Sequence, residues 1–318
     1  MRSTLDHENF LGFVRLLLKV QRVKAALPNG EEGNVLERAF YHGLLGLRLF
    51  RTVGNIDCNR VIKLTLAAAL TAYLREVPED EFAPELFPFR REIHELMSGS
   101  SKEARLIGAH GERFNTVVAG RMDDPELSSF IEFLDQVRAI RRVIPVPGRP
   151  TPENDAEHST SVALCAWYLM TSHRESWGSN IARACIDALI HDVKEAYSGD
   201  TPAFGDPQLL ATKAAREEAG LAEVEAKFPW LGQMVREYEE RDDPASKIVY
   251  EVDKVVPVAI IGLAGGDGRW HDPRYAFDRE LTRLQSTCSA PLFGPLGTDL
   301  LEFFEERIIY LRAARVRA

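Results

Sequence analysis

Apolar residues recur at helical spacing along most of the chain. They return at positions i, i+3, i+4 and i+7, which is the pattern of a helix with one face against a core. The predicted helices are 10–26, 36–50, 61–74, 127–143, 163–170, 181–196 and 245–261. Alternating apolar and polar runs, which predict strands, are few. The pattern therefore predicts an all-α protein.

Proline- and glycine-rich segments separate the predicted helices. The stretches 145–152, 199–207 and 262–273 are expected to be loops. The first predicts an extended connector, either between domains or as a rigid wall beside a site. The glycines of 262–268 lack the lysine of a phosphate-binding loop, so they predict the end of the preceding helix.

Composition and charge narrow the function classes. The chain has 318 residues, 45% of them hydrophobic, which is enough for about two domains with full cores. A formal net charge of −9 argues against a nucleic acid polymer as partner, because such binding needs basic surface. Small anionic substrates remain possible, since a metal ion and one or two arginines can reverse the local field.

Nothing in the sequence predicts export or a membrane partner. The N-terminus has no signal-peptide pattern, and the longest uncharged apolar run, 255–266, is too short to span a bilayer. We expect a cytoplasmic protein in which the four cysteines are reduced and behave as small buried hydrophobes: Cys58, Cys165, Cys185 and Cys288.

Imidazole and carboxylate side chains interrupt apolar helical runs at three places. The residues are His158, the adjacent pair His191 and Asp192, and Asp253. Burying such groups without partners is expensive, and a divalent cation would satisfy all of them. Two imidazoles and two carboxylates suit one Mn, Co, Ni, Fe or Zn ion, with coordination positions left for water and substrate.

Two further acidic residues follow the His-Asp pair. Glu195 comes four residues after His191, so on the predicted helix 181–196 it lies one turn along on the same face. A carboxylate there would orient or deprotonate a water nucleophile. Asp200 follows in a Ser-Gly-Asp-Thr-Pro turn, from which it would reach a substrate hydroxyl beside Thr201.

The three motifs together resemble those of a known family. They read Glu-x-x-Ala-Glu-His-Ser at 153–159, Ala-Leu-Ile-His-Asp-x-x-Glu-x-x-x-Gly-Asp-x-Pro at 188–202, and Tyr-Glu-x-Asp-Lys at 250–254. Over about residues 138–265 this pattern resembles HD-domain proteins of the 5′-deoxynucleotidase branch. The resemblance implies an all-helical HD-domain bundle that acts as a metal-dependent phosphoric monoester hydrolase on nucleoside 5′-monophosphates.

The resemblance also implies roles for individual residues. It places a single metal on His158, His191, Asp192 and Asp253, and it makes Glu195 the residue that serves the water nucleophile. Arg142 matches an arginine that contacts the substrate phosphate, and Asp200 matches a substrate-binding aspartate. The chain departs from the branch at Val143, where a tryptophan often helps to select deoxyribose. The sugar preference is therefore left open.

Two alternatives use the same motifs. A nucleoside triphosphate phosphohydrolase or pyrophosphatase would need the same metal centre. A nucleotide-binding regulatory or scaffold protein would bind the nucleotide with little turnover.

Other HD branches fit the sequence less well. Two-metal HD branches need further histidines, and none lies between 192 and 252. Alarmone hydrolases carry Glu-Asp where this chain has Glu195-Ala196.

The N-terminal half shows a second, weaker copy of the pattern. Segments 21–23, 34–38, 69–76 and 135–137 resemble segments 141–143, 154–158, 188–195 and 253–255 at offsets of 118 to 120 residues. Arg38, Ala72 and Tyr73 then stand in place of ligands, and Asp135 alone survives of the four.

This repeat predicts two domains. Residues 1–137 would be a degenerate, metal-free HD-like helical domain, and residues 138–318 the HD phosphohydrolase domain. The halves would pair as an internal pseudo-dimer, or the protein would form a homodimer. We expect His42, His94 and His110 to be structural or surface residues.

Overall fold

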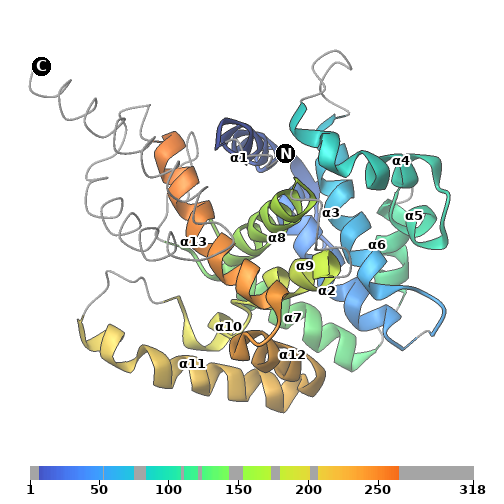
Figure 1. Cartoon of the computed structure of the whole chain (residues 1–318). Helices are drawn as coiled ribbons and strands as arrows, with labels where there is room; N and C mark the ends of the chain where they lie inside the picture. The colour runs from blue at the N-terminus through green and yellow to red at the C-terminus, as the bar shows by residue number, and fades with distance from the viewer. Residues whose placement is uncertain are drawn as a thin grey trace, which may run out of the picture.

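The computed structural model describes residues 7–52, 54–74, 84–108, 111–120, 124–142, 153–172, 180–200 and 207–264 of the chain. These residues are helical apart from one short hairpin and the connecting turns, which confirms the predicted all-α class (Figure 1). None of the helices in these ranges combines the length and the hydropathy needed to cross a membrane.

The N-terminal half begins with a helix and a hairpin and continues as a series of helices. Its elements are α1 (His7–Val20), β1 (Lys24–Ala26), β2 (Glu32–Asn34), α2 (Val35–Phe50), α3 (Cys58–Leu74), the 3-10 helix η2 (Pro84–Phe89), α4 (Arg90–Ser98), α5 (Lys102–Ile107) and α6 (Gly111–Ala119). The hairpin is antiparallel, with Ala25 opposite Gly33.

The C-terminal half consists of helices alone within the described residues. They are α7 (Pro125–Ala139), α8 (Asp155–Ser172), α9 (Asn180–Ile190), α10 (Glu195–Ser198), α11 (Pro207–Lys227), α12 (Pro229–Glu240) and α13 (Pro244–Ala264). The sequence pattern did not reveal α4, α5, α6, α11 or α12.

Helix α8 is the centre of the fold. All its residues from Asp155 to Met170 are buried, so this helix has no solvent face. Helices α2, α9 and α13 pack against it (Figure 1). Its C-terminal end is apolar, and Tyr168 stacks on Phe13 of α1 with ring centroids 4.4 Å apart. Its N-terminal end is polar and buried, which is unusual unless other groups satisfy those side chains.

The first predicted helix, 10–26, is wrong at its C-terminal end. Helix α1 ends at Val20, and residues 24–26 instead pair with 32–34. The intervening turn contains Asn29 and Gly30, and Gly30 has φ +86°, a conformation that glycine adopts without strain. The apolar residues that follow Val20 therefore belong to a hairpin, because this turn closes two short strands.

The predicted helix 127–143 also ends early, at Ala139. The chain then extends, and the Arg142 amide donates to the carbonyl of Glu153 at 2.9 Å. An isolated antiparallel bridge joins Arg141 to Asn154. This pairing brings Arg142 beside the N-terminal end of α8. Val143 and the connector 145–152 lie outside the described residues.

The predicted helix 181–196 is broken where the chemistry begins. Helix α9 ends at Ile190, residues 191–194 form a turn, and α10 starts at Glu195. The His191 Nδ1–H donates a hydrogen bond to the carbonyl of Ala188. The Glu195 amide donates to the carbonyl of Asp192 at 2.9 Å. Glu195 is therefore placed by this turn and not by the face of a continuous helix, which corrects the expectation.

The two halves meet through equivalent helices of the suspected repeat. Helix α2 packs against α3 as α8 packs against α9, and α2 packs against α8. The surviving carboxylate, Asp135, accepts hydrogen bonds from Asn29 Nδ2 at 2.7 Å and from the Tyr41 hydroxyl. The repeat itself stays a prediction, as does its pairing as a pseudo-dimer.

The remaining histidines and cysteines of interest occupy ordinary positions. His42 is buried against Asn115, with 2.7 Å between Nε2 and Oδ1, and burial lowers its pKa to about 3. His94 is exposed. Cys58 is half-buried, and Cys165 and Cys185 are buried free thiols. His110 and Cys288 lie outside the described residues.

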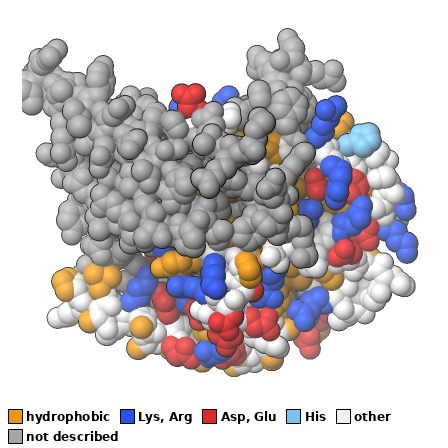
Figure 2. Space-filling view, in the orientation of Figure 1, with side chains coloured by type: hydrophobic (Ala, Val, Ile, Leu, Met, Phe, Trp, Pro, Cys, Tyr) orange, Lys and Arg blue, Asp and Glu red, His pale blue; other side chains and the backbone are white. Residues whose placement is uncertain are grey.

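Acidic and basic side chains alternate over α11 and α12, at the bottom of Figure 2. Arg236 pairs there with Glu218 at 2.8 Å. Lys194, from the turn after α9, reaches Glu217 of α11 at 3.3 Å and bonds Glu239 of α12. These pairs tie the turn that carries His191 to the two outer helices.

Candidate metal centre

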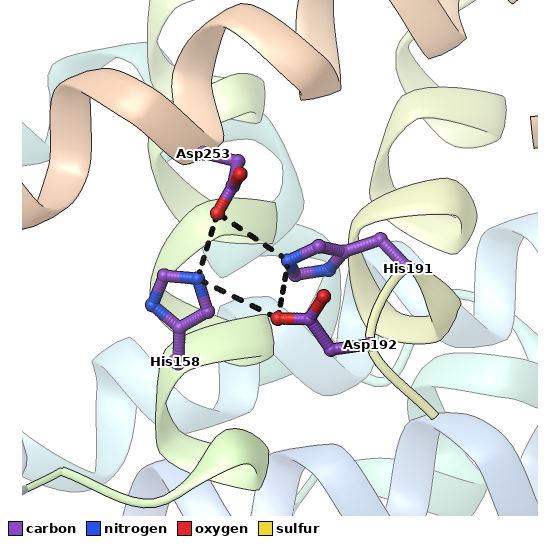
Figure 3. Close-up of side chains that lie close together, drawn as sticks. All are labelled: His158, His191, Asp192 and Asp253. Carbon is purple, nitrogen blue, oxygen red and sulfur yellow. Dashed lines mark hydrogen bonds and ion pairs between the residues drawn. The ribbon is translucent and has the colours of Figure 1, made fainter. Parts of the chain in front are cut away.

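Four side chains from three helical segments point toward one another (Figure 3). His158 comes from α8, His191 and Asp192 from the turn directly after α9, and Asp253 from α13. Asp253 Oδ1 lies 3.0 Å from His158 Nε2 and 3.6 Å from His191 Nε2. Asp192 Oδ2 lies 3.0 Å from His191 Nε2 and 4.0 Å from His158 Nε2. The four residues that the sequence grouped therefore come together.

Both imidazoles direct Nε2 into this cluster. The His191 Nδ1–H donates to the carbonyl of Ala188 at 2.7 Å, so the lone pair of the neutral ring is on Nε2. His191 Nε2 is buried and makes no well-aligned hydrogen bond. His158 Nδ1 faces Glu153 instead, with 3.4 Å to Oε2. Each ring thus presents the nitrogen that a cation would need.

The charges of the four groups depend on one another. Burial alone would lower the pKa of His191, but the carboxylates of Asp192 and Asp253 outweigh it and raise that pKa to about 10. Burial acts against ionisation of Asp192, yet His191 and Arg142 hold the pKa of this carboxyl below its usual range. Both aspartates are therefore ionised, as carboxylates that bind a cation must be.

The residues fit a divalent cation. One ligand atom from each of His158, His191, Asp192 and Asp253 lies within 4.8 Å of the other three. The set has two nitrogen and two oxygen donors, which suits mid-row transition metals. The buried Nε2 of His191 without an aligned partner is the atom that such an ion would satisfy.

Glu195 lies beside the cluster in a second acidic group. Carboxylate oxygens of Asp155, Asp192 and Glu195 lie within 4.8 Å of one another. Burial, followed by the charges of Asp192 and Asp155, raises the pKa of Glu195 well above its usual value. Among the described residues, no group hydrogen-bonds its buried Oε2 atom. A carboxyl of this kind can hold or accept a proton next to Asp192.

Arg142 occupies the space between these carboxylates. Its Nη1 atom lies 2.7 Å from Asp192 Oδ2 and 3.4 Å from Asp155 Oδ1. Burial would lower the pKa of Arg142, but Asp192, Asp155 and Glu195 raise it well above the usual value. Within the part of the chain that the structure describes, the buried Nε atom has no hydrogen-bond partner. The guanidinium is thus charged, and its Nε–H is available as a hydrogen-bond donor.

The expected substrate residues are described in part. Asp200 is half-buried after α10, and burial raises its pKa while Arg142 opposes the shift. This interaction places Asp200 in the electrostatic range of the site. Thr201 lies outside the described residues.

Sequence reasoning missed three residues that line the site. Asp155 is fully buried beside Arg142, and burial raises its pKa to about 7. Glu153 is fully buried beside His158, and the Lys254 ammonium bonds Asp253 Oδ2. The available signal was the polar run at 153–155 directly before a helix. A run of that kind is ordinarily solvated, and its burial depends on the contact between α8 and the N-terminal half.

Comparison with known proteins identifies one family. Residues 134–290 match the family model described as HD domain. The chain matches none of the curated proteins and none of the solved structures with which it was compared. The matched segment begins within α7 and includes all four converging side chains. The match supports placing residues 134–290 in the HD-domain superfamily, whose members are in general metal-dependent phosphohydrolases.

Proposed function

We propose that this HD-domain protein hydrolyses a phosphate ester on a nucleotide, with nucleoside 5′-monophosphates as its substrate class. One observation carries the proposal. The partly buried guanidinium of Arg142 lies 2.7 Å from Asp192 Oδ2, and its buried Nε–H has no acceptor among the described residues. A phosphoryl group beside Asp192 would supply that acceptor.

The metal and the chain have separate tasks in this proposal. A bound divalent ion supplies Lewis-acid stabilisation of a phosphoryl oxygen and activation of water. His158, His191, Asp192 and Asp253 would hold it. Arg142 binds and orients the phosphate, because its planar fork can donate two parallel hydrogen bonds.

Glu195 has the position and the proton affinity for general base catalysis. Its carboxylate lies next to Asp192 and has a raised pKa, so it can take a proton from the attacking water. Asp155, with a pKa of about 7, keeps the other side of Arg142 in place. Asp200 would accept a hydrogen bond from a sugar hydroxyl, and Thr201 would contact the substrate beside it.

The test is a substrate screen with metal-loaded protein. Purified protein with Mn²⁺ or Co²⁺ should release inorganic phosphate from nucleoside 5′-monophosphates. The Asp192→Ala variant should be inactive, and the Asp242→Ala variant, which removes an exposed carboxylate outside the site, should match the wild type. Wild-type turnover by Asp192→Ala would contradict the mechanism.

The products distinguish the alternatives. Release of pyrophosphate or triphosphate from nucleoside triphosphates would indicate a triphosphate hydrolase that uses the same centre, and not a monophosphatase. Bound metal and bound nucleotide without turnover on any member of the panel would indicate a regulatory or scaffold protein.

A further inference from the structure

A buried carboxylate connects His158 to the N-terminal half of the chain. Glu153 is fully buried, and its Oε1 atom accepts a hydrogen bond from Gln21 Nε2 at 2.9 Å. Its Oε2 atom lies 3.4 Å from His158 Nδ1. Within the described residues, neither Glu153 Oε2 nor His158 Nδ1 has a hydrogen-bond partner. The two atoms therefore have each other as the available donor and acceptor.

We propose that Gln21 and Glu153 are positioning residues for the candidate metal centre, an inference that rests on the metal site of the proposed function. Gln21 fixes the Glu153 carboxylate, and that carboxylate accepts the Nδ1 hydrogen of His158. Without a metal, His158 Nε2 donates to Asp253 Oδ1 at 3.0 Å. When an ion takes the place of that proton, the neutral ring has one N–H, and holding it on Nδ1 would leave the Nε2 lone pair for the ion.

His191 shows the same arrangement with a different acceptor. Its Nδ1 atom is held by the Ala188 carbonyl of its own helix at 2.7 Å. His158 lacks such a backbone partner among the described residues and uses a side chain, which in turn is held by Gln21, 132 positions earlier in the chain. Orientation of one ligand is thus local, and orientation of the other depends on the N-terminal half.

A reciprocal pair of helix caps fixes the segment that carries Glu153. Asn34 caps α2 and Asn154 caps α8, and each accepts from the amide of the glutamate three residues on, Glu37 at 3.1 Å and Glu157 at 2.9 Å. Asn154 Nδ2 donates to Glu37 Oε1 at 2.8 Å. Asn34 Nδ2 donates in turn to Glu157 Oε1. Each capping asparagine therefore also donates a hydrogen bond to the glutamate in the first turn of the other helix.

These reciprocal hydrogen bonds end at Glu157, one residue before His158. Glu157 is fully buried, and the Thr160 hydroxyl adds a hydrogen bond to the carbonyl of Leu36 at 3.0 Å. The N-terminal end of α8 is consequently fixed in position by α2 on one side and by Gln21 through Glu153 on the other. The N-terminal half thus contributes to the candidate metal centre, although none of the four candidate ligands comes from it.

The test measures metal affinity in the full-length, metal-free protein without substrate. Co²⁺ is titrated against a competing chelator at pH 7.5, with the wild type and the variants Gln21→Leu and Glu153→Gln. We expect both variants to bind Co²⁺ about 10- to 100-fold more weakly, as is usual when the partner of a ligating histidine is lost. Affinities within twofold of the wild type in folded variants would overturn the proposal.

The matched control is Thr65→Val. Thr65 is buried in α3 and donates to the carbonyl of Val61 at 2.8 Å, so this variant also loses one buried hydrogen bond. It should lower the melting temperature without changing Co²⁺ affinity. Equal weakening of Co²⁺ binding in Thr65→Val would mean that the effect of Gln21→Leu is structural, and the proposal would fail.

A measurement on the wild type needs no variant to fold. In Zn²⁺-loaded protein with ¹⁵N-labelled histidine, the His158 resonances should show a protonated, hydrogen-bonded Nδ1 and a metal-bound Nε2. Protonation of Nε2 would contradict the proposal. These results are independent of turnover, so a protein that binds metal in this way and hydrolyses no nucleotide would refute the proposed function alone.

Discussion

Nη1 of Arg142 lies 2.7 Å from Asp192 Oδ2, and the same carboxylate oxygen lies 3.0 Å from Nε2 of His191. One oxygen therefore joins the candidate phosphate-binding residue to the candidate metal centre. A substrate phosphoryl group bound by Arg142 would lie next to the ion. This relationship depends on the extended segment after α7, which brings Arg142 back to α8.

Replacing Arg142 should weaken substrate binding without weakening metal binding. A hydrogen bond to a charged group contributes roughly 1.5–3 kcal/mol, so Arg142→Lys should raise KM about 10- to 100-fold. Lysine keeps the charge but not the two parallel donors. Metal affinity should stay the same or increase, because the guanidinium competes with the ion for Asp192. Loss of metal from Arg142→Lys would show that this residue supports the ligands and does not bind substrate.

Replacing Glu195 should affect the chemical step. Glu195→Gln keeps the size of the side chain and removes its ability to accept a proton, so kcat should fall about 10²- to 10⁴-fold. Bound metal and KM should change little, because Glu195 is not among the four ligands. Steady-state kinetics on the metal-loaded variant checks this. A variant that keeps its kcat but releases the ion would make Glu195 a ligand instead.

Metal affinity should rise with pH. In the metal-free protein the pKa of His191 is raised to about 10, so its ring holds a proton at neutral pH. The ion can bind only after this proton leaves, and each released proton makes the apparent affinity up to about tenfold tighter per pH unit below 10. Co²⁺ titrations at pH 6.5, 7.5 and 8.5 measure the slope. An affinity that does not vary over this range would mean that His191 is already neutral.

The raised pKa of His191 also makes the stability of the metal-free fold depend on pH. A folded-state pKa above the usual 6.5 means that protonated His191 contributes stability below pH 6.5, and that this contribution is lost as the pH rises through about 10. Metal-free protein should therefore become less stable to urea between pH 7 and pH 10. Metal-loaded protein should lack this trend, because the ion replaces the proton.

The four candidate ligands could be grouped from the sequence because each is an exception to its surroundings. His191 and Asp192 directly follow a buried apolar helix, and Asp253 interrupts another, so convergence on a cation would satisfy all of them. The fold class followed from helical periodicity in the same way. Both inferences use local patterns. The structure confirms the fold class and brings the four side chains together, while their binding of a metal stays a prediction.

The surroundings of the ligands depend on tertiary contacts and could not be predicted. Nothing local in the segment 153–157 shows that it is buried, since a polar run before a helix is ordinarily a solvated cap. Its burial follows from the contact with Asn34 and Glu37, more than a hundred residues earlier. The break after Ile190 was missed because the His191 ring hydrogen-bonds a backbone carbonyl. The spacing of apolar residues carries no signal of such a bond.

Metal content measures the central claim most directly. Metal-free protein is reconstituted with Mn²⁺, freed of excess ion and assayed for bound metal per chain, as the wild type, as Asp253→Asn and as Asp243→Asn. Asp243 caps the same helix through the Ser246 amide at 3.1 Å and lies outside the cluster. We predict about one ion per chain in the wild type and in Asp243→Asn, and almost none in Asp253→Asn. Full metal content in Asp253→Asn, or none in the wild type, would contradict a metal centre built from His158, His191, Asp192 and Asp253.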